Sequence, residues 1–340
     1  MKNKNKKKIL IIGSKEKFSL ENMYLRALKS CGHKVNFIHT YNINKNFFYR
    51  FLWKFFKSYI YIIFRHKIIN YFDYNKKKYD LIIIFKGLYL NKIFFSKLKK
   101  FQKNAKWINI FPDDPFNTNK FEDISNQNFL ESIKLFDFFF IFSQKILKKL
   151  KTKYPSRNIE YLPFGYDHFR HKIYYKFKKK KYDLSFVGTA DQKRYKFLKK
   201  LKEFKIILAG NGWDKFQLTN NVTYLGNVDA KEFSNMVNNS IVSLNILRDQ
   251  NENSHNMKTF EIPAFGGVLL TKRSHEQNLF FPENTGSLMY GNIAELKKKI
   301  YFAKNNNKKI SKIKKRSKNI IRKHSYKNRS LFILKNIFND

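Results

Sequence analysis

Short, continuous runs of hydrophobic residues recur along the first half of the chain, and stretches of mixed polarity separate them. These runs predict strands at 8–13, 35–39, 80–85, 107–111, 136–142 and 159–162. Strands without polar alternation are buried on both faces, which is typical of a parallel sheet covered by helices. A helix over about 18–30, ended by Gly32, joins the first two strands. The pattern predicts a doubly wound α/β domain.

The same alternation starts again at residue 182, after a polar and basic segment. It predicts strands at 182–188, 204–210, 222–226, 241–246 and 268–271, and a charged helical tail from about 292. We therefore expect two tandem Rossmann-like domains facing a cleft, because ligands of open parallel sheets bind at the carboxyl ends of the strands. The expected parts are an N-terminal domain (1–167), a linker (168–181), a C-terminal domain (182–315) and C-terminal helices (316–340) whose expected packing partner is the N-terminal domain.

Residues 46–69 predict a helix with two interpretations. A polar stripe is spaced along one side of it, and large hydrophobic residues fill the other sides. The helix either crosses over the first sheet or lies on an acidic membrane surface as a peripheral contact. The stripe consists of Arg50, Lys54, Lys57, Tyr61 and Arg65.

The formal net charge of +45 would ordinarily indicate a nucleic-acid or acidic-membrane partner. However, the basic residues are 59 Lys and only 11 Arg, they are spread over the whole chain, and Asn, Ile, Phe and Tyr are also abundant. This mixture is typical of an AT-rich genome, whereas proteins that read nucleic acids favour Arg. We interpret the charge as compositional and expect no specific nucleic-acid partner.

Other classes of site are poorly supported. Cys31 is the single cysteine, so no internal disulfide forms, and we expect a cytoplasmic location, peripheral at the inner membrane face if 46–69 contacts lipid. The eight His are scattered and no Asp-x-Asp occurs, so we expect neither a metal nor a cofactor. No run of about 18 residues is free of charge, so no spanning helix is expected.

The strongest candidate chemistry lies in one helix of the second domain. Glu261 sits in an otherwise apolar helix that stops at Gly266 and Gly267 before a buried strand. A buried carboxylate needs a partner, and sugar hydroxyls can provide one. Lys258, one turn earlier, and Asn256, near the helix start, suit a phosphate. The alternative is a structural helix in which Glu261 and Lys258 pair only with each other.

Two further turns of the second domain could receive a phosphate. Gly188 and Thr189 follow the first strand and offer backbone N–H groups and a hydroxyl, with Arg194 just beyond. Gly210 and Gly212 follow the next strand and permit close approach of a ligand. The complete G-x-G-x-x-G of nicotinamide-binding proteins is missing, and no Walker A sequence occurs.

Two adjacent carboxylates, Asp113 and Asp114, follow the fourth strand between two prolines. One of them could act as a general base towards an acceptor hydroxyl. Neighbouring side chains of an extended chain point in opposite directions, so we expect one to enter the site. The alternative is an Asp- and Pro-rich turn.

The stretch from Asn256 to Gly267, NMKTFEIPAFGG, resembles the signature of the CgeB-type, or spore-maturation-protein-like, glycosyltransferases. Further stretches resemble landmarks of that family in the family's order, and the likeness covers about 107–329. These are the Asp-Asp-Pro at 113–115, LPFGYD at 162–167, SFVGT at 185–189 and HSY-x-x-R at 324–329.

The resemblance implies a metal-independent GT-B glycosyltransferase with a donor-binding C-terminal domain and an acceptor-binding N-terminal domain. Glu261 stands where related enzymes have a donor-binding glutamate. Lys258 replaces the usual Arg and so loses the planar fork. Many retaining relatives have a Glu where this chain has Asn253, so the stereochemistry stays open.

We therefore expect transfer of a sugar from a nucleotide sugar to a hydroxyl of a cell-surface glycan or its lipid-linked precursor. Two alternatives remain. One is a Rossmann-type, nucleotide-dependent oxidoreductase, against which the incomplete glycine fingerprint argues. The other is a non-enzymatic basic protein that binds membranes or nucleic acids, whose binding would follow total charge and vanish in moderate salt.

Overall fold

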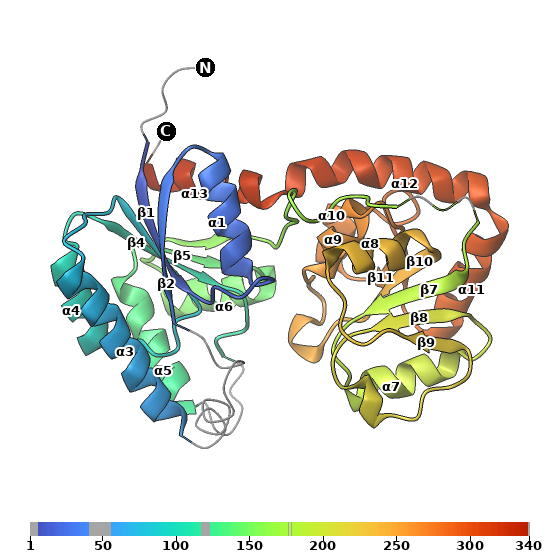
Figure 1. Cartoon of the computed structure of the whole chain (residues 1–340), viewed down its shortest axis with the longest axis horizontal. Helices are drawn as coiled ribbons and strands as arrows, with labels where there is room; N and C mark the ends of the chain where they lie inside the picture. Colours follow the sequence, from blue (N-terminus) through green and yellow to red (C-terminus); the bar gives the residue numbers. More distant parts are fainter. Residues whose placement is uncertain (1–5, 41–55, 117–122, 176, 178, 339–340) are drawn as a thin grey trace. The chain divides into compact units, whose positions relative to one another are not determined.

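The computed structural model describes residues 6–40, 56–116 and 123–338, except 176 and 178 (Figure 1). The chain divides into two compact units. The first comprises residues 1–163 together with 327–340, and the second comprises residues 164–326. Helices lie on both faces of the sheet in each unit (Figure 1).

The described residues of the first unit hold a parallel sheet in the order β2-β1-β3-β4-β5-β6. The fold prediction is confirmed, and the strand ends differ from the predicted ends by at most two residues. The strands are β1 (Lys8–Gly13), β2 (Lys34–His39), β3 (Leu81–Phe85), β4 (Lys106–Phe111), β5 (Phe138–Ile141) and β6 (Ile159–Tyr161). The helices are α1 (Leu20–Ser30), α3 (Lys57–Tyr74), α4 (Lys92–Phe101), α5 (Asp123–Ser132), α6 (Gln144–Lys153) and α13 (Tyr326–Phe338).

The described part of the predicted 46–69 helix is α3, which packs as a crossover helix. Its buried side carries Ile60, Phe64 and Ile68. Tyr61 of the predicted polar stripe is also buried. Arg65 donates from Nε to the carbonyl of Tyr89 at 2.7 Å, so this end of the stripe faces the protein. Of the rest of the stripe, Lys57 is the first residue of α3, and Arg50 and Lys54 lie outside the described residues.

The second unit repeats the architecture, with a parallel sheet in the order β12-β11-β10-β7-β8-β9. The last strand, β12, was not predicted because its three residues are too few to show a pattern. The strands are β7 (Tyr182–Val187), β8 (Ile206–Ala209), β9 (Val222–Tyr224), β10 (Ser240–Asn245), β11 (Leu269–Lys272) and β12 (Leu288–Tyr290). The helices are α7 (Gln192–Leu198), α8 (Ala230–Asn238), α9 (Lys258–Ala264), α10 (His275–Phe280), α11 (Ile293–Asn305) and α12 (Asn307–Ile321).

Residues 168–181, expected to form a linker, belong to the second unit. The backbone N–H of Tyr174 donates to the hydroxyl of Ser234 on α8 at 3.2 Å, and that hydroxyl donates to the carbonyl of Lys172 at 3.1 Å. The segment is therefore fixed against α8. The expected boundary at 315/316 falls within α12, which continues through it.

No helix in the described part of the chain is both long enough and apolar enough to cross a membrane.

Candidate functional site

The carboxyl ends of β7, β8, β10 and β11 meet at one edge of the second sheet, because all four strands are parallel. The predicted glycine turns follow β7 and β8 at this edge. The connection that follows β10 leads into α9, the helix of Glu261. The fold therefore brings the turns of Gly188 and Gly210 and the start of α9 to the same edge, whereas Gly266 and Gly267 directly precede β11 and lie towards its amino end.

Among the charged residues predicted to bind the donor, Glu261 is the most deeply buried, with 4% of its surface exposed. Its Oε2 lies 2.7 Å from Nζ of Lys258, one turn earlier on α9. Its Oε1 lies 3.8 Å from Nε2 of His171, which comes from the expected linker. Burial alone would raise the pKa of this carboxyl, but Lys258 and His171 outweigh burial and hold the pKa below its ordinary value. The site thus keeps a buried carboxylate charged.

His171 was not predicted, because nothing in the sequence around it indicates a buried position. Its Nδ1 accepts a hydrogen bond from the backbone N–H of Asp167 at 3.2 Å, so Nε2 carries the proton of the neutral ring and faces Glu261. Burial lowers the pKa of His171, and the smaller attraction of Glu261 opposes that shift. The ring is therefore neutral at pH 7.

This lowered pKa predicts a pH dependence of stability. The unfolded histidine titrates near 6.5, so just below that pH the unfolded state binds more protons than the folded state. Stability should fall as the pH drops below about 6.5, with a slope of at most about 1.4 kcal/mol per pH unit. His171→Gln should flatten this part of the profile, measured as the unfolding midpoint between pH 5 and 7.5. Exposed His275 provides the control, and a profile that His171→Gln leaves unchanged would contradict the assignment.

The glycine pair after α9 is explained by the end of the helix. Gly266 has a left-handed φ of +82°, and the N–H of Gly267 donates to the carbonyl of Ile262 at 3.0 Å, which caps the helix. A Cβ on Gly267 would lie 2.4 Å from Cγ1 of Val237 on α8. Both glycines therefore fix the end of α9, and their backbone N–H groups are already bonded to carbonyls of that helix.

Arg194 also has a structural position. It is 7% exposed, and its guanidinium donates to the carbonyl of Thr189 at 2.9 Å and to that of Ile246 at 2.8 Å. It thereby joins the turn after β7 to the turn after β10. These bonds use two of the five N–H groups of the guanidinium, and Nε has no hydrogen-bond partner in the described residues, so the phosphate contact of Arg194 stays a prediction.

The turns after β7 and β8 interlock. The carbonyl of Gly188 accepts from the indole of Trp213 at 2.7 Å, and the N–H of Gly188 donates to Ala209 at 2.9 Å. Gly210 has φ +129°, and a Cβ there would lie 2.2 Å from the Gly188 oxygen. Gly212 has φ +80°. Within the described residues, the N–H and hydroxyl of Thr189 have no partner, so they are the groups of this turn that are available to a ligand.

Asn256 forms a reciprocal amide pair with Asn245, the last residue of β10, through bonds of 3.1 and 2.9 Å. It anchors the start of α9 to the sheet. The neighbouring His255 is fully buried, and its Nδ1 lies 2.8 Å from Oε2 of Glu276. The sequence predicted that Asn256 lies near an anion, whereas in the structure its side chain has a protein partner, as has that of His255.

Asp113 and Asp114 follow β4 at the carboxyl edge of the first sheet and differ in their contacts. Asp113 forms an ion pair of 2.8 Å with Lys86, which follows β3. Asp114 accepts from the backbone N–H of Phe116 at 2.9 Å and so shapes its own turn. The two carboxylates therefore have different partners, and the expected general base stays a prediction; Lys86 is a partner that the sequence did not indicate.

In the described ranges, no group of three or more His, Cys, Asp or Glu is placed to hold a metal ion. The charged groups Glu261 and Lys258 and the neutral ring of His171 converge in the second unit. Such a set can accept hydrogen bonds from hydroxyls and offer positive charge to an anion.

Comparisons with known proteins bear on the fold and on the kind of protein. Residues 193–335 match a family model described as glycosyl transferase-like. A search of curated proteins found no match. The resemblance to solved structures extends over almost the whole chain at low sequence identity, and it shows the fold. The TM-score is 0.72 for sucrose-phosphate synthase from Thermosynechococcus elongatus, at 11% identity over 97% of this chain and 98% of that one.

A glycosyltransferase from Rickettsia africae gives a TM-score of 0.64 at 14% identity, covering 99% of this chain and 100% of that one. A T4 phage β-glucosyltransferase variant gives 0.59 at 16% identity, covering 98% and 100%. The fold is therefore GT-B, and together with the family match it makes the chain a glycosyltransferase.

Proposed function

We propose that this glycosyltransferase binds its nucleotide-sugar donor at the carboxyl edge of the second sheet, where Glu261 accepts hydrogen bonds from sugar hydroxyls. The observation that carries the proposal is the buried, charged carboxylate held between Lys258 and His171. If this position served packing alone, an apolar residue would do at least as well, because replacing a buried ion pair by apolar side chains is often neutral or stabilising.

Lys258 is the residue best placed to meet the donor diphosphate. About 29% of its side chain is exposed, whereas Glu261 beside it is almost covered. Its ammonium can therefore turn from Glu261 to a phosphate without leaving the site. Negative charge on the leaving diphosphate grows in the transition state, so a lysine there accelerates transfer. The free N–H and hydroxyl of Thr189 are the matching donors on the neighbouring turn.

We propose that the enzyme is of the CgeB type and uses no metal or cofactor, because Lys258 and the Thr189 turn supply the positive charge and the hydrogen-bond donors. The motif around Glu261 supports the family assignment. The acceptor would be a hydroxyl of a cell-surface glycan or its lipid-linked precursor, held by the first unit. Asp113 is the proposed general base, because Asp114 accepts from the backbone of its own turn, whereas Asp113 pairs with the partly exposed side chain of Lys86.

A donor screen tests this proposal. Uridine diphosphate sugars come first, because the T4 phage enzyme was solved with UDP-glucose; the GDP, dTDP and CMP sugars follow. At 100 times its Kd a true donor adds about 2.7 kcal/mol to the stability of the folded state, which raises the melting temperature by several degrees. Asp113→Asn should keep this shift and lower turnover by about 100-fold. A shift with NAD(P) and with none of the sugar nucleotides would instead indicate the oxidoreductase.

A peripheral membrane contact through 46–69 is a separate proposal. It rests on Phe56, Tyr59 and Ile62, whose side chains are about half exposed at the start of α3. Binding to acidic vesicles that is unchanged in a Phe56→Ser/Tyr59→Ser/Ile62→Ser variant would contradict it.

A further inference from the structure

A groove of about 500 Å³ lies in the second unit, between α11, α12 and the loop before β12. Asn284 and Thr285 of that loop form one wall, and Phe302 of α11 and Ile313 of α12 form the apolar lining. The loop leads into the start of β12, so the groove lies towards the amino ends of the strands. The turns after β7 and β8 and the connection from β10 to α9 lie at the carboxyl ends. The groove is therefore separate from the site of Glu261.

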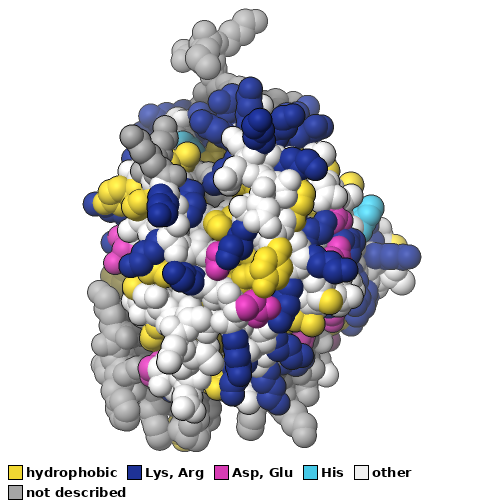
Figure 2. Space-filling view, turned by 90° about the vertical axis from the view of Figure 1, so that its right-hand side faces the viewer, with side chains coloured by type: hydrophobic (Ala, Val, Ile, Leu, Met, Phe, Trp, Pro, Cys, Tyr) yellow, Lys and Arg dark blue, Asp and Glu magenta, His cyan; other side chains and the backbone are white. Residues whose placement is uncertain are grey.

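The other lining residues are basic. Lys309, Lys312 and Arg316 are spaced 3 and 4 apart on α12, so they share one side of the helix. Helix α12 contains seven Lys and Arg and no acidic residue, and like charges at this spacing destabilise an isolated helix. In the part of the chain that the structure describes, none of the three has a carboxylate partner. Figure 2 shows Lys and Arg predominating, with hydrophobic side chains among them, on this side of the molecule.

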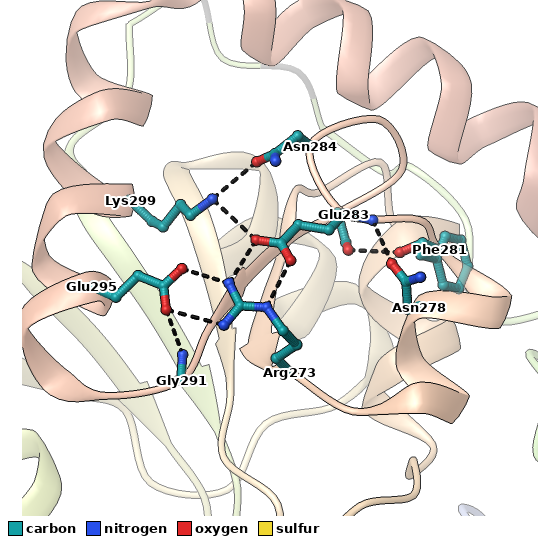
Figure 3. A network of polar contacts seen from close by, with 9 residues as sticks. Arg273, Asn278, Phe281, Glu283, Asn284, Gly291, Glu295 and Lys299 are labelled. Carbon is teal, nitrogen blue, oxygen red and sulfur yellow. Dashed lines mark hydrogen bonds and ion pairs between the residues drawn. The ribbon is translucent and has the colours of Figure 1, made fainter.

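Two acidic residues close to Asn284 of the groove wall, Glu283 and Glu295, are already paired, as Figure 3 shows. Arg273 forms ion pairs with Glu283 at 2.8 Å and with Glu295 at 2.5 Å, and Arg273 lowers the pKa of Glu295 to about 2. Lys299 joins Glu283 at 3.1 Å to the side-chain oxygen of Asn284 at 3.0 Å. In this network both carboxylates pair with Arg273 or Lys299, and Lys299 also holds Asn284 in the groove wall. These carboxylates therefore do not neutralise Lys309, Lys312 and Arg316 of α12, whose positive charges can attract an anionic ligand.

We propose that this groove binds a phosphate ester. Its phosphate lies among Lys309, Lys312 and Arg316, and its organic part lies against Phe302. The volume is that of a small-molecule site, and Asn284 and Thr285 add fixed hydrogen-bonding groups to the charge. A site that merely attracted a nucleic-acid backbone would need the charges but not the apolar side chains of Phe302 and Ile313. The ester is either a free small molecule or the headgroup of a lipid.

The full chain should be titrated with phenyl phosphate, which combines a phosphate with a ring, and binding measured by calorimetry at fixed ionic strength. The groove variant is Lys309→Gln/Lys312→Gln/Arg316→Gln. The matched control is Lys308→Gln/Lys315→Gln/Lys318→Gln, which removes the same charge from exposed positions of the same helix outside the groove. We expect phenyl phosphate to bind at least tenfold more weakly to the groove variant, and within about twofold of wild type to the control.

The proposal would be overturned if the two variants lost binding affinity equally. It would also be overturned if the wild type bound neither phenyl phosphate nor the vesicles. Vesicles of phosphatidylglycerol, with phosphatidylcholine as reference, identify the source. Binding to these vesicles that is lost in the groove variant and kept in the control points to a lipid headgroup, whereas binding of phenyl phosphate alone points to a soluble ester. If single-stranded RNA binds more tightly than phenyl phosphate and the groove and control variants weaken its binding equally, only the total charge of the helix matters, and the proposal is wrong. Circular dichroism confirms that both variants are folded, and neither outcome depends on sugar transfer.

Discussion

Glu261→Gln is expected to lower the kcat/KM of sugar transfer by about 100-fold or more while the second unit stays folded. The substitution keeps the volume of the side chain and removes its charge. Lys258 then loses its buried partner, but its partly exposed ammonium can reach solvent, so the folded state survives. The donor hydroxyls lose a charged acceptor, which is the stronger kind of hydrogen bond. Steady-state kinetics with the donor identified by the screen, together with the melting temperature, provide the measurement.

Glu252→Gln is the matched control for this variant. Glu252 precedes α9 at an exposed position and pairs with Lys272 on β11 at 2.8 Å. Its substitution removes one carboxylate from the same region and should change transfer by less than about twofold, since an exposed ion pair is worth little. Wild-type activity of Glu261→Gln, or equal losses in the two variants, would remove Glu261 from the donor site. If Glu261→Gln fails to fold, Glu261→Asp keeps the charge, shortens the side chain and should still lower kcat/KM.

Gly210→Ala should destabilise the second unit by about 3 kcal/mol or more. A Gly→Ala change at a compatible position stabilises by about 0.4–1 kcal/mol, because it restricts the unfolded chain. At Gly210 the new methyl group would lie 2.2 Å from the carbonyl oxygen of Gly188, at a φ of +129° that side chains rarely adopt. That oxygen cannot withdraw freely, since it also accepts from Trp213. For a unit of this size, the expected fall in melting temperature is about 6–12 °C.

Gly226→Ala separates the two causes of that loss. Gly226 also has a left-handed φ, +71°, but a Cβ there would meet nothing within 4 Å. It therefore tests backbone strain without a collision, and it should cost about 1 kcal/mol. Equal effects at the two positions would show that the interlock between the turns after β7 and β8 contributes nothing, contrary to the geometry.

The fold was predictable where burial leaves a strong pattern. Each long apolar run became a strand, because a central parallel strand must be apolar on both faces. Leu288–Tyr290 escaped prediction because three apolar residues between Ser287 and Gly291 match many local structures. The expected linker was misread for a different reason. A basic, polar stretch is usually solvated, but His171 is buried by α9, which lies about 90 residues further along the chain.

The candidate site was only partly predictable, for reasons that particular residues make clear. Glu261 and Lys258 share a helix, so their proximity follows from spacing. Arg194 has the right chemistry for a phosphate, yet its guanidinium joins Thr189 to Ile246, two carbonyls that are 57 positions apart in the chain and meet only in the fold. Gly210 likewise looks like a turn that admits a ligand, and what closely approaches it is another stretch of backbone. A sequence gives the type of each residue, but it does not show which distant part of the chain contacts that residue in the folded structure.

The division of the chain also has a consequence for the order of events during synthesis. The second unit is one uninterrupted stretch, 164–326, whereas the first is completed only by 327–340. Within the first unit, Arg329 donates to the carbonyl of Pro163 at 3.0 Å, and Lys7 lies over the ring of Phe338 at 4.3 Å. On the ribosome, residues 1–163 are made first, but the first unit is complete only after α13 has been made. The second unit has all of its residues before that point. The nascent first sheet stays without α13 throughout that interval, and a chain truncated before 327 would leave the first unit, not the second, incomplete.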